Sequence, residues 1–60
     1  MYYKKNQALK AAQRVHLNVK EETKVIVEHD YSQNLYFIHV LPQGESQRHI
    51  CGTIVKTLTK

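Results

Sequence analysis

Four histidines and one cysteine are the residues of this chain with the most scope for chemistry near neutral pH. Zinc in proteins takes tetrahedral sites of histidine nitrogen and cysteine sulfur. Three neighbouring strands could in principle bring four such residues together. Their spacing matches no common zinc motif, however, and the chain has no second cysteine. We therefore predict no bound metal at the candidate ligands His29, His39, His49 and Cys51.

A catalytic interpretation would use His39 or His49 as a general base, as in small ribonucleases, or Cys51 as a nucleophile beside a histidine. No local signature supports either role, such as a nucleophile in a strained turn flanked by glycines. Gly44 and Gly52 are isolated, so there is no glycine-rich loop to hold a phosphate. We predict a binding protein that is not an enzyme and needs no cofactor. A histidine-dependent nuclease is our third functional alternative.

Positive charge is concentrated at the start of the chain. Residues 1–20 contain five lysines and arginines and no acid, residues 21–45 carry a net charge of −4, and residues 46–60 carry +3, for a total of +4. Lysine and arginine neutralise phosphates, and aromatic rings stack on unpaired bases. We predict weak binding of DNA or RNA, with low sequence specificity, through Lys4, Lys5, Lys10 and Arg14. The alternative is a solvated face that only keeps a small protein soluble.

Residues 35–41 are the most unusual segment, because His39 is the single polar residue among six apolar or aromatic ones. A strand that is apolar on both faces is usually covered on both, and one helix covers only one of them. We therefore expect a homodimer or a protein partner on the sheet, with Tyr36, Ile38 and Val40 at the interface. This is our second functional hypothesis, a protein-binding adaptor or inhibitor. The alternative is a central strand whose far side leaves some apolar area exposed.

The basic segment is predicted to form a helix from residue 5 to residue 16 or 17, with Asn6 as the N-cap. Its residues are mostly strong helix formers. One apolar stripe follows the helical spacing, at Ala8, Ala11, Ala12 and Val15. If this stripe packs on a sheet, Lys10 and Arg14 must point to solvent. Lysines close to the start of a helix oppose its dipole, so their presence there suggests another use.

Three strands are predicted after the helix, over residues 24–28, 35–41 and 49–58, because β-branched and aromatic residues dominate them. The last segment could instead be helical, because Ile50, Ile54 and Leu58 are also spaced by four. Gly52 and the threonines of this segment favour a strand.

The turn at residues 30–34 leaves the register of the first hairpin open. A five-residue loop pairs Val27 with Phe37, whereas a four-residue loop pairs Val27 with Ile38. A slip of one residue exchanges the faces of one strand relative to the other.

The 60 residues are enough for a single domain. We expect an α+β domain in which the N-terminal helix packs on a small antiparallel three-stranded sheet, in the order α-β-β-β. No run of about 18 apolar residues suits a membrane helix, and we expect no signal peptide. The single cysteine suits a reducing compartment, so we expect a cytoplasmic protein without a membrane partner.

Overall fold

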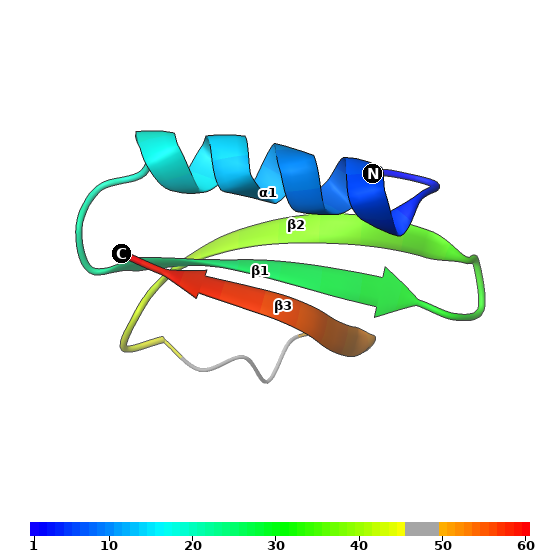
Figure 1. Ribbon diagram of the computed structural model, residues 1–60. Helices are drawn as coiled ribbons and strands as arrows, with labels where there is room; N and C mark the ends of the chain where they lie inside the picture. The colour runs from blue at the N-terminus through cyan, green and yellow to red at the C-terminus, as the bar shows by residue number, and fades with distance from the viewer. Residues whose placement is uncertain (46–49) are drawn as a thin grey trace.

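The chain folds as one helix followed by three strands. The computed structural model describes residues 1–45 and 50–60, which contain α1 (Lys5–Asn18), β1 (Thr23–Asp30), β2 (Leu35–Pro42) and β3 (Thr53–Thr59). The strands form one antiparallel sheet in the order β2-β1-β3, and α1 runs along one face of it (Figure 1). This confirms the predicted α-β-β-β arrangement of the α+β class.

Helix α1 begins where it was predicted but not with the predicted cap. Lys4 occupies the N-cap position, in an extended conformation and without a capping side-chain hydrogen bond, so the assignment of Asn6 as N-cap is wrong. The reason lies in the preceding residues. The N–H of Tyr2 donates to the carbonyl oxygen of Tyr36 in β2, and the N–H of Tyr36 donates back to the carbonyl of Tyr2, each at 2.8 Å. These two bonds hold Tyr2 in an extended conformation against the edge of β2, and the helix begins three residues later, at Lys5.

The helix is neither long enough nor apolar enough to cross a membrane, and it is the only helix in the described part of the chain. It continues to Asn18, slightly beyond the predicted end, and the side-chain amide of Asn18 donates to the carbonyl of Arg14 at 2.9 Å.

The core lies between α1 and the central strand. Ala8 and Ala12 of α1 and Val25 and Val27 of β1 have no exposed surface. The two alanines belong to the predicted stripe, and their small side chains let the helix approach the sheet closely. A ring of half-buried apolar residues surrounds this centre, comprising Tyr2, Leu9, Val15, Val19, Tyr36, Ile38, Val55 and Leu58.

The hairpin between β1 and β2 has the four-residue loop, because Val27 pairs with Ile38. The turn chemistry explains this choice. One carboxylate oxygen of Asp30 accepts hydrogen bonds from the backbone N–H of Ser32 at 3.0 Å, from the hydroxyl of Ser32 at 2.7 Å and from the N–H of Gln33 at 3.4 Å. Asn34 closes the loop with a φ of 55°, a left-handed conformation that asparagine tolerates well. The loop thereby sets which side chains of β2 face the helix.

The C-terminal segment is a strand, which excludes the helical alternative for its described residues. It begins at Thr53, later than predicted, and residue 49 of the predicted strand lies outside the described residues. Its pairing with β1 shifts register between Val27 and Glu28, as a β-bulge does. Lys56 pairs with Val27 and Ile54 pairs with Glu28, so Val55 is the extra residue.

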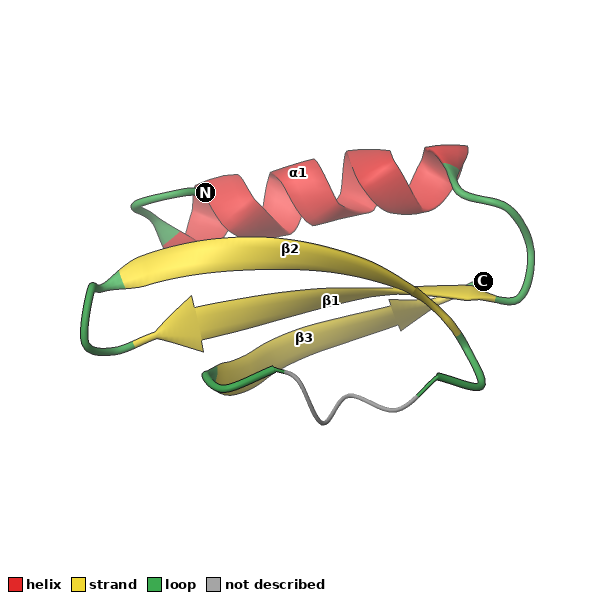
Figure 2. Ribbon diagram, turned by 180° about the vertical axis from the view of Figure 1, so that it is seen from behind, coloured by secondary structure: helices red, strands yellow, loops and turns green. Residues whose placement is uncertain are grey.

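The connection from β2 to β3 must return along the sheet, because both strands run antiparallel to β1, which separates them. Its described parts, residues 43–45 and 50–52, lie on the side of the sheet away from α1 (Figure 2). The Lys24 ammonium donates to the carbonyl oxygen of Glu45 at 2.8 Å, and Gly52 is bonded to Glu28. Ile26, between Lys24 and Glu28 on the same face of β1, is fully buried. The far side of β1 is therefore covered within the chain.

The close helix–sheet approach leads to a first prediction. Replacing Ala12 by Leu should lower the free energy of unfolding by about 1–3 kcal/mol, because the added carbons have no space between α1 and β1. The control is Ala11→Leu, which adds the same atoms at a half-buried position of the helix and should have a much smaller effect. Denaturant unfolding of both variants measures the difference. Equal losses of stability would contradict the assigned helix face.

The turn leads to a second prediction, which concerns pH. The pKa of Asp30 is lowered from 3.8, chiefly by the hydrogen bond from the Ser32 side chain. A carboxyl group with a lowered pKa in the folded state stabilises the fold above its ordinary pKa. That contribution is lost as the pH falls through the lowered value. In a carboxyl-detected NMR titration, Ser32→Ala should raise the pKa of Asp30 toward 3.8. An unchanged pKa in this variant would show that the hydroxyl is not the main cause.

Candidate functional site

The four basic residues of the predicted nucleic-acid site are all exposed. Lys10 and Arg14 are one turn apart and exposed, on the side of α1 opposite the buried alanines. Lys4 and Lys5 are exposed at the start of the helix. The exposure of Lys10 and Arg14 is as the helical spacing predicted, whereas Lys4 and Lys5 lie at the start of the helix. We call Lys4, Lys5, Lys10 and Arg14 the basic surface.

No acid neutralises this surface among the described residues. Helix α1 contains no aspartate or glutamate, and the ion pair that the structure shows, between Glu28 and His39, lies on the other side of the sheet. Asp30 accepts hydrogen bonds from its own turn. Glu21 and Glu22 follow the C-terminal end of α1, about the length of the helix away from Lys4. Two of the four cations, Lys4 and Lys5, lie at the N-terminal end of α1, where the helix dipole is also positive.

Two exposed apolar side chains border the basic surface. Leu17 is 75% exposed and lies one turn beyond Arg14, and Tyr3 is 73% exposed beside Lys4. Tyr2 differs from Tyr3, because it is half-buried in its bridge to β2. A nucleic acid on the basic surface would therefore meet one tyrosine ring, Tyr3, and one leucine.

The residues expected at a protein interface lie on the helix side of the sheet. Tyr36 and Ile38 pair with His29 and Val27 of β1 and pack against the core beneath α1. Val40 shares that face by alternation and is 48% exposed. Tyr36 and Ile38 are therefore engaged with the chain's own helix. The sequence left two registers open for the hairpin, and a slip of one residue exchanges the faces of the strand. The sequence therefore could not show which face of residues 35–41 packs against the helix.

The opposite face of β2 carries the other half of its apolar residues. Leu35, Phe37 and Leu41 alternate with the helix-facing residues. Leu35 is buried, and Phe37 and Leu41 are half-buried. The chain itself thus buries Leu35 and covers Phe37 and Leu41 in part, and the homodimer or protein partner on the sheet stays a prediction.

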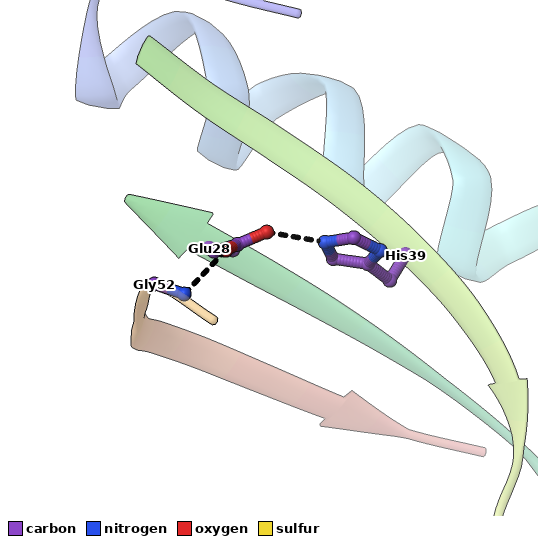
Figure 3. A network of polar contacts seen from close by, with 3 residues as sticks. All are labelled: Glu28, His39 and Gly52. Atoms are coloured by element: carbon purple, nitrogen blue, oxygen red, sulfur yellow. Dashed lines mark hydrogen bonds and ion pairs between the residues drawn. The ribbon is translucent and has the colours of Figure 1, made fainter. Parts of the chain in front are cut away.

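On this face, Glu28 of β1 forms a polar network with His39 of β2 and Gly52 (Figure 3). One carboxylate oxygen accepts from Nε2 of His39 at 2.6 Å, and the other accepts from the backbone N–H of Gly52 at 2.6 Å. Glu28 is buried and His39 is partly exposed. The carboxylate thus joins β1 to β2 and to the segment that enters β3. Sequence reasoning missed the role of Glu28. The available signal was an acid directly after the apolar run 25–27 of the predicted strand.

The histidines that the structure describes do not form one cluster. His29 lies on the helix side of β1, where its ring stacks on Tyr36 at 4.3 Å between centroids, and its Nε2 donates to the side-chain oxygen of Asn34 at 3.1 Å. His39 lies on the opposite face, paired with Ile26. The two side chains thus point away from each other across the sheet. His49 lies outside the described residues, and no group of three potential metal ligands occurs within them.

Comparison of the chain with protein-family models, curated proteins and solved structures gave no match. The basic surface of α1 and the covered, internally bonded sheet are therefore the features from which a function can be inferred.

The network at Glu28 leads to a third prediction. A Cβ atom at position 52 would lie 2.5 Å from a carboxylate oxygen of Glu28 and 2.7 Å from the carbonyl oxygen of His29. Gly52→Ala should therefore displace the entry to β3 and destabilise the fold by about 1–3 kcal/mol in denaturant unfolding. Gly44→Ala is the matched control, because nothing lies within 4 Å of its Cβ position. It should leave stability unchanged or raise it by up to about 1 kcal/mol. Equal effects would show that the Glu28–Gly52 contact is absent in solution.

Proposed function

We propose that this protein binds nucleic acid through the basic surface of α1, weakly and with little sequence specificity. The observation that supports this most directly is the set of four exposed cations on a helix without acids. In the described part of the chain, no ion pair or side-chain hydrogen bond engages Lys4, Lys5, Lys10 or Arg14. Such charges are available for a polyanion at no cost in internal contacts.

The physical basis of the proposed binding is the release of counterions from phosphates by lysine and arginine. Lys10 and Arg14 reach along one side of the helix, and Lys4 and Lys5 extend the contact at its start, where backbone N–H groups also favour an anion. Phosphate contacts of this kind carry no sequence information. The exposed ring of Tyr3 can add stacking on an unpaired base of either DNA or RNA.

We propose binding rather than catalysis for this surface, and a cytoplasmic location. The Glu28–His39 contact, which most resembles a catalytic pair, lies on the face of the sheet opposite α1. The Gly52 N–H that shares Glu28 gives this contact a structural role. The location follows from the single cysteine, Cys51, which suits a reducing compartment.

The second hypothesis, an adaptor that binds proteins through the apolar sheet face, has less support. Tyr36 and Ile38 are covered by α1, and most apolar residues on the far face are at least half-buried. Ile54, at 40% exposure, is the exception there. A small apolar area of this kind is ordinary for a soluble surface.

The fourth prediction tests the basic surface. Fluorescence anisotropy with labelled mixed-sequence oligonucleotides, single and double stranded, should show binding at low salt. If three or four phosphates are neutralised, the logarithm of the binding constant should fall with the logarithm of salt concentration with a slope of about −3. Lys10→Glu combined with Arg14→Glu should abolish binding, because two cations become repulsive anions, while the unfolding curve stays close to that of the wild type.

A matched pair of single variants separates the surface from the net charge. Lys10→Glu and Lys20→Glu change the net charge equally at two exposed lysines, but Lys20 follows the end of α1. Lys10→Glu should weaken binding more and should reduce the salt slope by about 1. The proposal is wrong if no oligonucleotide binds at low salt, or if binding survives the double charge reversal.

A further inference from the structure

The two edges of the sheet are protected to different degrees. The outer edge of β2 pairs with Tyr2 through two backbone hydrogen bonds of 2.8 Å, and β2 ends in Pro42, which has no N–H to offer. At the other edge, β3 pairs with β1 on one side, and no segment of the described chain pairs with its outer side. Its seven residues include one charge, at Lys56. An edge of this kind can accept a further strand.

The direction of the backbone groups shows where such a strand would bond. The N–H of Lys60 donates to Thr23 and its carbonyl accepts from Glu22, so both groups point toward the side of β1. Backbone direction repeats every second residue in a strand, so Thr57 and Thr59 direct their N–H and C=O groups outward. The carbonyl of Thr59 agrees with this, since it accepts from His16 of α1 at 2.9 Å. The outward groups of Thr57 are left at the open edge.

A hollow lies beside this edge, between the helix and β3. It has a volume of about 140 Å³ and is lined by Leu9 and Gln13 of α1 and by Lys56 and Leu58 of β3. A cavity of about 150 Å³ lined by apolar residues can hold a benzene molecule, so this hollow has room for one aliphatic or aromatic side chain. A strand added to β3 would direct alternate side chains toward it.

The charges around the hollow indicate which kind of added strand would fit there. Neither α1 nor β3 contains an acid, whereas Lys56 is exposed at the hollow and Lys10 and Arg14 lie farther round the same helix. A second copy of the chain, paired edge to edge, would bring two Lys56 residues and two basic helices together, which is electrostatically unfavourable. An extended segment with one apolar side chain and acidic neighbours is complementary to both the hollow and its charge.

We propose that the groove between α1 and β3 binds an extended, acidic segment of a protein partner, which adds to the sheet as a fourth strand at β3. Main-chain hydrogen bonds to Thr57 would supply affinity. The hollow formed by Leu9, Gln13 and Leu58 would accept the apolar side chain, and Lys56 would pair with an acidic residue two positions away. This proposal does not rest on nucleic-acid binding, because the groove lies on the flank of α1 that faces β3.

The test uses the full chain, labelled with nitrogen-15, and a peptide of the sequence Thr-Glu-Thr-Leu-Thr-Glu-Thr. This alternation places the leucine and both glutamates on one face of the added strand. NMR titration should move the amide signals of Thr57 and its neighbours in β3, together with those of Leu9 and Gln13. Replacing the peptide leucine by serine, or its glutamates by lysines, should weaken binding by about tenfold or more. No shifts, or shifts centred elsewhere, would overturn the proposal.

Two variants of the protein sharpen the test. Lys56→Glu should reverse the preference, so that the lysine peptide binds better than the glutamate peptide. Thr57→Pro removes an N–H that points outward and should abolish binding of the glutamate peptide while the remaining amide signals stay in place. If Thr57→Pro unfolds the protein, the reversal by Lys56→Glu still decides, and an unchanged preference in that variant refutes the proposal.

Two further outcomes would assign the edge to a different occupant. Sedimentation of the protein alone as a dimer, with the Thr57 amide protected from hydrogen exchange, would show that a second copy covers β3. An oligonucleotide that moves the β3 and Leu9 signals, where the acidic peptide does not, would make the groove part of the nucleic-acid surface. Either result overturns the acidic-segment proposal. A monomer whose groove responds to the acidic peptide supports it.

Discussion

Strand β1 lies between β2 and β3, and six consecutive residues of it, 24–29, are buried. The rest of the structure depends on this double coverage. On one face, Val25 and Val27 pack beneath the alanines of α1. On the other, Lys24 and Glu28 bond to the connection between the outer strands, and Ile26 is buried between them. A chain this short buries only about 60% of its unfolded surface, so covering one strand completely gives it most of the core it has.

The polar residues of β1 are compatible with burial because each is bonded. Lys24 donates to the carbonyl of Glu45, and Glu28 accepts from His39 of β2 and from the N–H of Gly52, just before β3. The ring of His29 stacks on Tyr36 and its Nε2 bonds to Asn34. Among the described side chains, no buried nitrogen or oxygen lacks a partner. A buried polar group without a hydrogen bond costs about 1–3 kcal/mol. The bonds of Lys24 to Glu45 and of Glu28 to Gly52 also hold the β2–β3 connection against the far face of the sheet.

The consequence of this internal pairing is a division of charge. Lys24, Glu28 and Asp30 of the sheet are bonded within the fold, whereas Lys56 of β3 and the cations of α1 face solvent. The edges are divided in a similar way. Tyr2 closes β2, whereas β3 keeps outward backbone groups beside a small hollow. The surfaces that remain available for a partner are thus the outer side of α1 and the groove that leads from it to β3.

Local pattern was sufficient for the helix and the first two strands, whereas the last segment stayed open between strand and helix. The spacing of Ala8 and Ala12 predicted the buried side of α1, and with it the exposure of Lys10 and Arg14, because a helix repeats every 3.6 residues whatever it packs against. The strands were predicted from their β-branched and aromatic residues, which suit a pleated surface. The function of the basic surface stays a prediction, and no comparison with known proteins tests it.

Tertiary structure decided everything that depends on which segments meet. The pairing of Tyr2 with Tyr36 overrode the capping preference of Asn6. The Asp30–Asn34 turn selected the register, which placed Tyr36 and Ile38 under the helix and His29 and His39 on opposite faces. The sequence by itself determined the helix, the first two strands and which side chains share a face within each regular stretch, because those periodicities are local; it left the last segment open between strand and helix. Only the fold decided which face is covered and which edge is open, because these follow from contacts between residues far apart in the chain.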